Sequence, residues 1–240
     1  MNDKKFLQIP AIILGLSLIL SVVILGSYLY KIRALDNTLT VTGSARQKVV
    51  SDTGKFIGRF SRTVSIDDLK KGYQLMKSDQ AKVVAYFKSQ GIEDVKISPV
   101  SQNEIWKQNE YDNRPKQYTL QQTVEINLND VKKLEAISKD FSKLIDQDIL
   151  FTLDRVEYYY SKLPEARISM LGDAIKDAKA RAEKIANSSG KRVNVIKSAS
   201  MGVVQVLSPN SIDVSDYGTY DTSTVDKEIM VTVRALFTIK

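Results

Sequence analysis

The sequence predicts an α+β fold, with a mainly antiparallel sheet of about seven strands and three helices on one face, preceded by one N-terminal transmembrane helix. Between residues 37 and 240, the hydrophobic period alternates between two, typical of strands, and 3.6, typical of helices. The expected order is ββα ββα βα ββ. Because paired strands are joined most simply by hairpins, this order favours antiparallel over parallel pairing. The separate N-terminal helix is predicted from residues 6–30, which carry no charge.

Residues 6–30 form a run of 25 uncharged residues. At about 1.5 Å per helical residue, this run is long enough to cross the roughly 30 Å hydrocarbon core of a bilayer. A cleaved signal peptide is the alternative, but its apolar region is normally about 7 to 15 residues long and ends at a small-x-small site. Here the run ends in Tyr28, Tyr30 and Lys31, which favours an uncleaved anchor with interfacial aromatic residues. A buried core helix is the third interpretation.

The flanking charges do not choose an orientation, because Lys4 and Lys5 precede the apolar run and Lys31 and Arg33 follow it. The few residues before the run leave little else for that side, so we expect the N-terminus inside and the body outside. Residues 1–36 would then be a stub, anchor and linker, and residues 37–240 an extracytoplasmic domain. The expected location is the cell membrane, with a single pass and a periplasmic or cell-surface body.

The chain contains no His and no Cys, and 35 Lys and Arg residues stand against 28 Asp and Glu residues. This composition excludes a zinc site with His or Cys ligands, a Ser-His-Asp triad and a disulfide. The net charge of +7 is mild, and no basic run of the nucleic-acid type occurs. Composition leaves open only chemistry by carboxylate, Lys, Tyr or Ser side chains. Because no such site stands out in the sequence, we expect no enzyme activity, no catalytic, cofactor-binding or metal site, and no nucleic-acid partner.

The body elements are each bounded by turn or capping residues. Asp67 or Asp68 can open the first helix and Gly91 can end it, while Pro164 suits the first turn of the last helix. The last helix carries a stripe of small residues that lets it pack very close to a neighbour. The expected strands are 39–45, 55–65, 95–106, 118–128, 149–160, 193–197 and 229–239, and the expected helices are 67–91, 129–145 and 164–188.

Three motifs in the body resemble one known family. They are Leu39–Ala45 followed by Val49, Ser51 and Asp52; Val124–Leu134; and Ala174–Ala186. In their order and spacing they resemble the SIMPL domain (DUF541) family, which includes a periplasmic immunogen and YggE-type oxidative-stress proteins. Ser51 stands where the family usually has proline. The resemblance implies an extracytoplasmic α+β domain with no established reaction and no catalytic residue, and some members assemble into large rings.

Four groups of residues invite a functional interpretation. Asp177 and Arg181 are spaced to pair on one helix face, which favours helix support over an ion site. Tyr158, Tyr159 and Tyr160 can form a stacking platform, although a core and interface role needs fewer assumptions. The third group is a pair of aromatic residues at the hairpin tip, Trp106 and Tyr111. The fourth group lies in residues 198–226, a segment without Lys or Arg, and consists of Asp213, Asp216, Asp221 and Asp226 with Tyr217 and Tyr220.

The carboxylates in residues 198–226 could bind a hard cation such as calcium, but their spacing matches no EF-hand loop, so we expect a solvated loop there. The sequence thus favours a membrane-anchored, non-enzymatic oligomeric scaffold or envelope-protection component, held in the bilayer through residues 6–30. The alternative is a binding module for an anionic ligand, either a wall polymer or a lipid headgroup. A carboxylate hydrolase is the third hypothesis, but no pair of acids has environments that would separate their pKa values.

Overall fold

The computed structural model describes residues 3–34, 37–106, 115–139 and 141–240. The chain folds into two compact units, each assembled from separate stretches of sequence. The first unit comprises residues 1–46, 167–204 and 230–240, and the second comprises residues 47–166 and 205–229. The order of elements is α+β, as the sequence predicts.

Helix α1 (Asp3–Ala34) contains the apolar run. Its residues Ile13–Lys31 are long and apolar enough to cross a membrane, and they are the only such helix in the described part of the chain. All the side chains of residues 13–31 are exposed, including Leu14 at 64% and Ile19 at 64%. This exposure separates α1 from a buried core helix, which would pack its apolar side chains against other elements.

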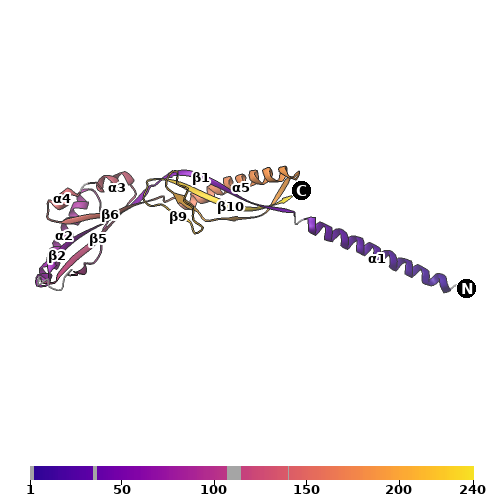
Figure 1. Ribbon diagram of the computed structural model, residues 1–240, viewed down its shortest axis with the longest axis horizontal. Coiled ribbons are helices and arrows are strands. Elements are labelled where there is room, and N and C mark those ends of the chain that lie inside the picture. The colour runs from indigo at the N-terminus through magenta and orange to yellow at the C-terminus, as the bar shows by residue number, and fades with distance from the viewer. Residues whose placement is uncertain (1–2, 35–36, 107–114, 140) are drawn as a thin grey trace. The chain divides into compact units, whose positions relative to one another are not determined.

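In the first unit, the part of strand β10 (Asp226–Ile239) from residue 230 onward pairs antiparallel with β7 (Val193–Met201). Strand β10 is also hydrogen-bonded to β1 (Thr38–Val50), of which residues 38–46 belong to this unit. Helix α5 (Leu163–Ser188) packs on these strands, as Figure 1 shows. The small residues of α5 recur every fourth position and are at most 1% exposed: Ala174, Ala178, Ala182 and Ala186. The prediction that this stripe is a close-packing face is confirmed.

In the second unit, the strand order is β3-β5-β2-β6, and β4 also pairs with β5. The five strands are β2 (Thr53–Ser65), β3 (Val95–Ile97), β4 (Ser101–Ile105), β5 (Gln117–Leu128) and β6 (Leu150–Tyr159). One face packs against α2 (Leu69–Ser89), α3 (Val131–Ile137) and α4 (Ser142–Ile145). Phe56, Phe87 and Phe151 meet in the core, with ring centroids 5.6 to 6.2 Å apart.

Two polar groups enter the core of the second unit with partners. Arg62 of β2 pairs with Asp79 of α2, which is only 2% exposed; Arg62 Nη2 donates to Asp79 Oδ1 at 2.9 Å. Gln122 is the one polar residue on the inward face of β5, as the alternation predicts. Its amide nitrogen donates to Ser98 O at 2.8 Å and to Gln80 Oε1 at 3.1 Å, which compensates the burial of the nitrogen, while its oxygen Oε1 has no partner among the described residues.

The structure corrects the predicted sheet. The described residues form ten strands in two five-stranded sheets, not about seven strands in one, and the helices are divided between the two sheets. Strand 95–106 is broken at Pro99, which has no N–H to donate, while the neighbouring Ser98 Oγ accepts from Thr123 N at 2.8 Å. Helix 129–145 is broken into α3 and α4; Ser138 at the break donates to Glu135 O at 2.8 Å and competes with the helical ladder.

Residues 198–226 are also more ordered than the sequence suggests. Strand β7 continues to Met201, and two short strands follow, β8 (Gln205–Leu207) and β9 (Thr219–Tyr220). The two short strands pair in parallel, and β8 lies next to β10. All three residues of β8 are buried, so the prediction of a solvated loop is correct only for part of this segment.

Candidate functional site

A pocket of about 250 Å³ lies in the second unit. Three segments form its walls: Lys48–Val50 at the end of β1, Pro209 and Asn210 after β8, and Asp226–Glu228 at the start of β10. The apolar part of the wall includes Val50, whose side chain is 60% exposed. Asn210 has φ of 63°, a left-handed conformation that turns the chain at the pocket rim. The pocket therefore combines apolar surface with carboxylate and ammonium groups.

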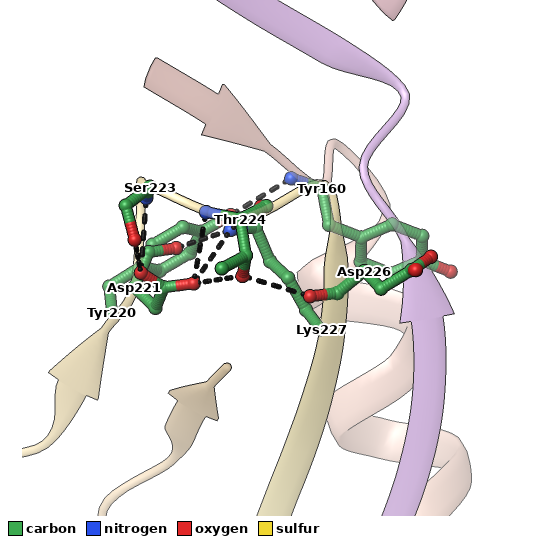
Figure 2. Close-up of polar contacts among 7 residues, drawn as sticks. All are labelled: Tyr160, Tyr220, Asp221, Ser223, Thr224, Asp226 and Lys227. Carbon is green, nitrogen blue, oxygen red and sulfur yellow. Dashed lines mark hydrogen bonds and ion pairs between the residues drawn. The ribbon is translucent and has the colours of Figure 1, made fainter. Parts of the chain in front are cut away.

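Lys227 connects the β10 wall of this pocket to the turn that precedes β10. Its side chain is 0% exposed, and its ammonium donates to Thr224 O at 2.7 Å and to Asp221 O. Lys227 Nζ also lies 3.6 Å from Asp221 Oδ2 and 5.8 Å from the centre of the Tyr220 ring. Figure 2 shows this ammonium directed into the turn that connects β9 to β10. Burial lowers the pKa of Lys227, and Asp221 opposes that shift.

Asp221 organises the same turn through both carboxylate oxygens (Figure 2). Its Oδ1 accepts from Ser223 N at 3.0 Å and Ser223 Oγ at 2.6 Å, and its Oδ2 accepts from Thr224 N at 3.3 Å and from Thr224 Oγ1. Burial alone would raise the pKa of Asp221, but these hydrogen bonds and Lys227 lower it to about 2. The carboxylate thus stays ionised and bonded at neutral pH, which suits a structural clamp and not a proton donor.

The four carboxylates singled out in residues 198–226 do not converge. Asp213 and Asp216 are exposed, Asp221 is held in its turn, and Asp226 lines the pocket. Among the described residues, no group of three or more acidic, His or Cys side chains is placed to hold a metal ion. Tyr217 is 97% exposed, whereas the hydroxyl oxygen of Tyr220 accepts from Tyr160 N at 2.9 Å.

The three consecutive tyrosines do not form one stacking platform. Tyr158 packs against the core of the second unit, while Tyr159 lies on the opposite face of β6 with its ring 5.8 Å from that of Tyr220. Tyr159 Oη donates to Glu157 Oε2 at 2.8 Å, and this bond, followed by burial, raises the pKa of Tyr159 to about 12. The structural interpretation of these residues agrees with these contacts.

Asp52 has a role that sequence reasoning did not assign. Its Oδ1 accepts from Ser161 N at 2.8 Å and its Oδ2 from Ser161 Oγ at 2.7 Å, which ties the β1–β2 turn to the segment before α5. Burial would raise the pKa of Asp52, but the bonds from Ser161 lower it below its ordinary value. The neighbouring Ser51 is 5% exposed, and its hydroxyl has no partner in the described part of the chain.

Asp177 and Arg181 form the predicted ion pair, with Arg181 Nε 2.9 Å from Asp177 Oδ2. The same carboxylate oxygen accepts from Ser44 N of β1 at 2.8 Å. This hydrogen bond, followed by Arg181, lowers the pKa of Asp177. Gly43 is the reason that β1 comes so near, because a Cβ there would lie 2.3 Å from Ala174 O and Ala178 N. The pair therefore supports the contact between α5 and β1.

Of the two hairpin-tip aromatics, Trp106 is 87% exposed at the end of β4, and Tyr111 lies outside the described residues. Lys227 is one of the buried polar residues that the sequence analysis did not assign, along with Asp79 and Gln205. The alternation of β10 places Lys227 on the same face as Ile229 and Val231, so extending the strand pattern by one step would have found it.

Comparison with known proteins gives one result over most of the chain. A family model described as SIMPL, a protein of unknown function (DUF541), matches residues 39–237. A search of curated proteins finds no match. The matched range covers both compact units and begins after the apolar helix.

Proposed function

The chain belongs to the SIMPL (DUF541) family, and on that premise we propose that it is a membrane-anchored, extracytoplasmic protein without enzymatic activity. Residues 6–30 anchor it in the cell membrane, with the N-terminus inside. Residues 37–240 form a body that associates with further copies of itself. In this proposal the assembly acts as a scaffold or protective component of the envelope, including protection against oxidative stress.

The support for the anchor is the exposure of α1. Over residues 13–31 every side chain is exposed, and these residues include large apolar side chains such as Leu18 and Leu25, at 60% and 61%. A surface of this kind is stable in hydrocarbon and unfavourable in water.

The chain has no cysteine, so a single introduced cysteine reports the side of the membrane. Ser189→Cys in intact cells should react with a membrane-impermeant maleimide, and protection of that residue would overturn the orientation.

The support for a non-enzymatic role comes from Lys227, which lines the pocket, and from its partner Asp221 in the turn between β9 and β10. The ammonium of Lys227 is fully buried, the side chain of Asp221 is 17% exposed, and both groups hold this one turn. A general acid or base needs a pKa near the working pH, whereas the pKa of Asp221 is about 2. These groups stabilise the wall of the pocket rather than offer a proton to a substrate.

The observation that carries self-association is an acidic segment with exposed apolar side chains, most of which lies in the second unit. Residues 198–226 contain four aspartates and no Lys or Arg, and the segment exposes Ile212 at 87% and Tyr217 at 97%. Residues 167–197 instead carry eight Lys and Arg residues against three acids. An acidic segment and a basic segment on the same chain favour heterologous contacts between copies, in which the acidic segment of one copy meets the basic segment of the next. Such contacts close into a ring when the rotation from one subunit to the next completes a full turn.

Sedimentation and native mass measurement test this proposal. The two samples are the full chain in a nonionic detergent and the body of residues 31–240. We expect a multimer at micromolar concentration that dissociates as salt is raised, because exposed charges are screened. A double substitution, Ile212→Ser with Tyr217→Ser, should weaken the assembly, and Trp106→Ser, which removes another exposed aromatic, should not. A single species at the monomer mass, unchanged on concentration, would remove the scaffold role.

A further inference from the structure

A second pocket, of about 240 Å³, lies on the helical side of the second unit. The end of α2 contributes Tyr86 and Gln90, α3 contributes Lys133 with Ala136 and Ile137, and α4 contributes Lys143. Ile137 is buried at 7% exposure, so it forms an apolar floor. The wall that faces solvent is polar and carries two ammonium groups and a side-chain amide.

Lys133 is held at this pocket by a specific contact. Its Nζ donates to Gly91 O at 2.8 Å, so the ammonium is fixed beside the last turn of α2 and keeps further N–H groups for a ligand. Asp130 begins α3 by accepting from Lys133 N at 3.0 Å, which fixes the backbone of the same residue. The ammonium is thus placed before any ligand arrives.

Lys143 is the second cation of the pocket, and it has a different environment. It is exposed and makes no hydrogen bond or ion pair with any described residue. Among the described residues, the Gln90 side-chain amide makes one long hydrogen bond, from Nε2 to Ser89 Oγ at 3.5 Å, so it too can donate to a ligand. One positioned ammonium, one unengaged ammonium and one amide therefore line a single hollow.

The surrounding charge has the same sign. Residues 82–91 and 131–143, the segments that form this pocket, contain six lysines against one glutamate and one aspartate. A concave surface with an excess of cations concentrates anions from solution. The apolar floor formed by Ala136 and Ile137 adds room for an organic part beside the charged group.

We propose that this pocket binds a phosphate ester, with Lys133 and Lys143 donating to the phosphate oxygens and Gln90 to the alcohol part. Lysine ammonium groups bind phosphate as point charges, and the pocket volume exceeds that of a bare phosphate. The same chemistry is presented by the headgroup of an anionic lipid and by a soluble glycerol phosphate. The site does not depend on self-association of the body.

The test uses the full chain in nanodiscs of neutral phosphatidylcholine, titrated with glycerol 3-phosphate and followed by calorimetry. We expect saturable binding that weakens with added salt. In a second arm, phosphatidylglycerol replaces part of the lipid in the same discs. Competition by this lipid, seen as weaker binding of the soluble probe, identifies the headgroup as a source, whereas unchanged binding assigns the site to a soluble phosphate ester. Absence of saturable binding in the neutral discs would overturn the proposal.

The variants are matched in charge. Lys133→Gln with Lys143→Gln should weaken glycerol phosphate binding about tenfold or more, since two charge-assisted hydrogen bonds are lost. Lys70→Gln with Lys184→Gln removes the same charge from exposed positions outside the pocket and should change binding less than about twofold. Because Lys133 also holds Gly91 O, Lys143→Gln alone serves as the variant that leaves the fold intact, and it should weaken binding as well. Equal weakening in the pocket and control pairs would assign the effect to overall charge and overturn the site.

Discussion

Replacing Ala178 by Leu tests the closest contact of the first unit. Ala178 is 0% exposed on α5, and a Cβ built at Gly43 of β1 would lie 2.7 Å from Ala178 Cα and 2.3 Å from Ala178 N. The backbones of helix and strand are therefore already in contact, and leucine adds an isopropyl group where no space exists. We expect the free energy of unfolding to fall by about 1 to 3 kcal/mol, the usual cost of overpacking.

The assay is a thermal melt of the full chain in detergent, followed by far-UV circular dichroism. For a protein of this length each kcal/mol corresponds to roughly 2 to 4 °C, so Tm should fall by about 2 to 12 °C. The control is Lys179→Leu, one residue further along the helix. Lys179 is 58% exposed and its pair with Glu183 spans 3.8 Å, so its loss should change stability by no more than about 0.5 kcal/mol. Equal Tm values for the two variants would refute the assigned helix face.

Three further predictions concern the buried clamp, its pH dependence and the anchor. Lys227→Met should lower the free energy of unfolding by about 3 kcal/mol, because Asp221 and two carbonyls lose a buried cation. Chemical denaturation measures this loss. Adding Asp221→Asn should recover part of the loss if the two groups act together. Since the pKa of Asp221 in the folded protein is about 2, its contribution to stability is complete above about pH 4 and is lost as the pH falls through 2. Asp221→Asn should therefore flatten the dependence of stability on pH in this range. A flattening of the same size in Asp213→Asn would contradict the assignment of the effect to Asp221. Leu18→Arg should cost about 2.5 to 3.5 kcal/mol of membrane insertion, and unchanged resistance to carbonate extraction in this variant would count against the anchor.

Local periodicity was sufficient to predict most elements of the body, because alternation and the helical stripe reflect burial on one face. Strand β5 is the clearest case: its inward positions are buried as the pattern predicts, with Gln122 as the polar exception. The break at Pro99 was readable in principle, since proline cannot donate to a sheet ladder. The division into two sheets was not readable, because strand partners such as β2 and β6 are about 100 residues apart and their pairing depends on the whole fold.

The pockets were beyond sequence reasoning for the same physical reason. The first joins residues 48–50 to residues 209–210 and 226–228, and the second joins the end of α2 to α3 and α4. Neither set contains a spacing that points to a ligand. Lys227 was hidden because it looks like the charged residue that usually precedes a strand, whereas its ammonium replaces the solvent that would otherwise satisfy the carbonyls of Asp221 and Thr224.

The motifs that resemble the family acquire a physical meaning when their contacts are compared. The strand motif Leu39–Ala45 and the helix motif Ala174–Ala186 are separated by more than 120 residues in sequence, yet they are two halves of one contact. Gly43 admits the helix backbone, and Asp177 accepts the N–H of Ser44. A glycine without its small-residue helix leaves a gap, and the helix without that glycine meets a Cβ at 2.3 Å. The two motifs therefore constrain each other, and this packing accounts for their joint presence.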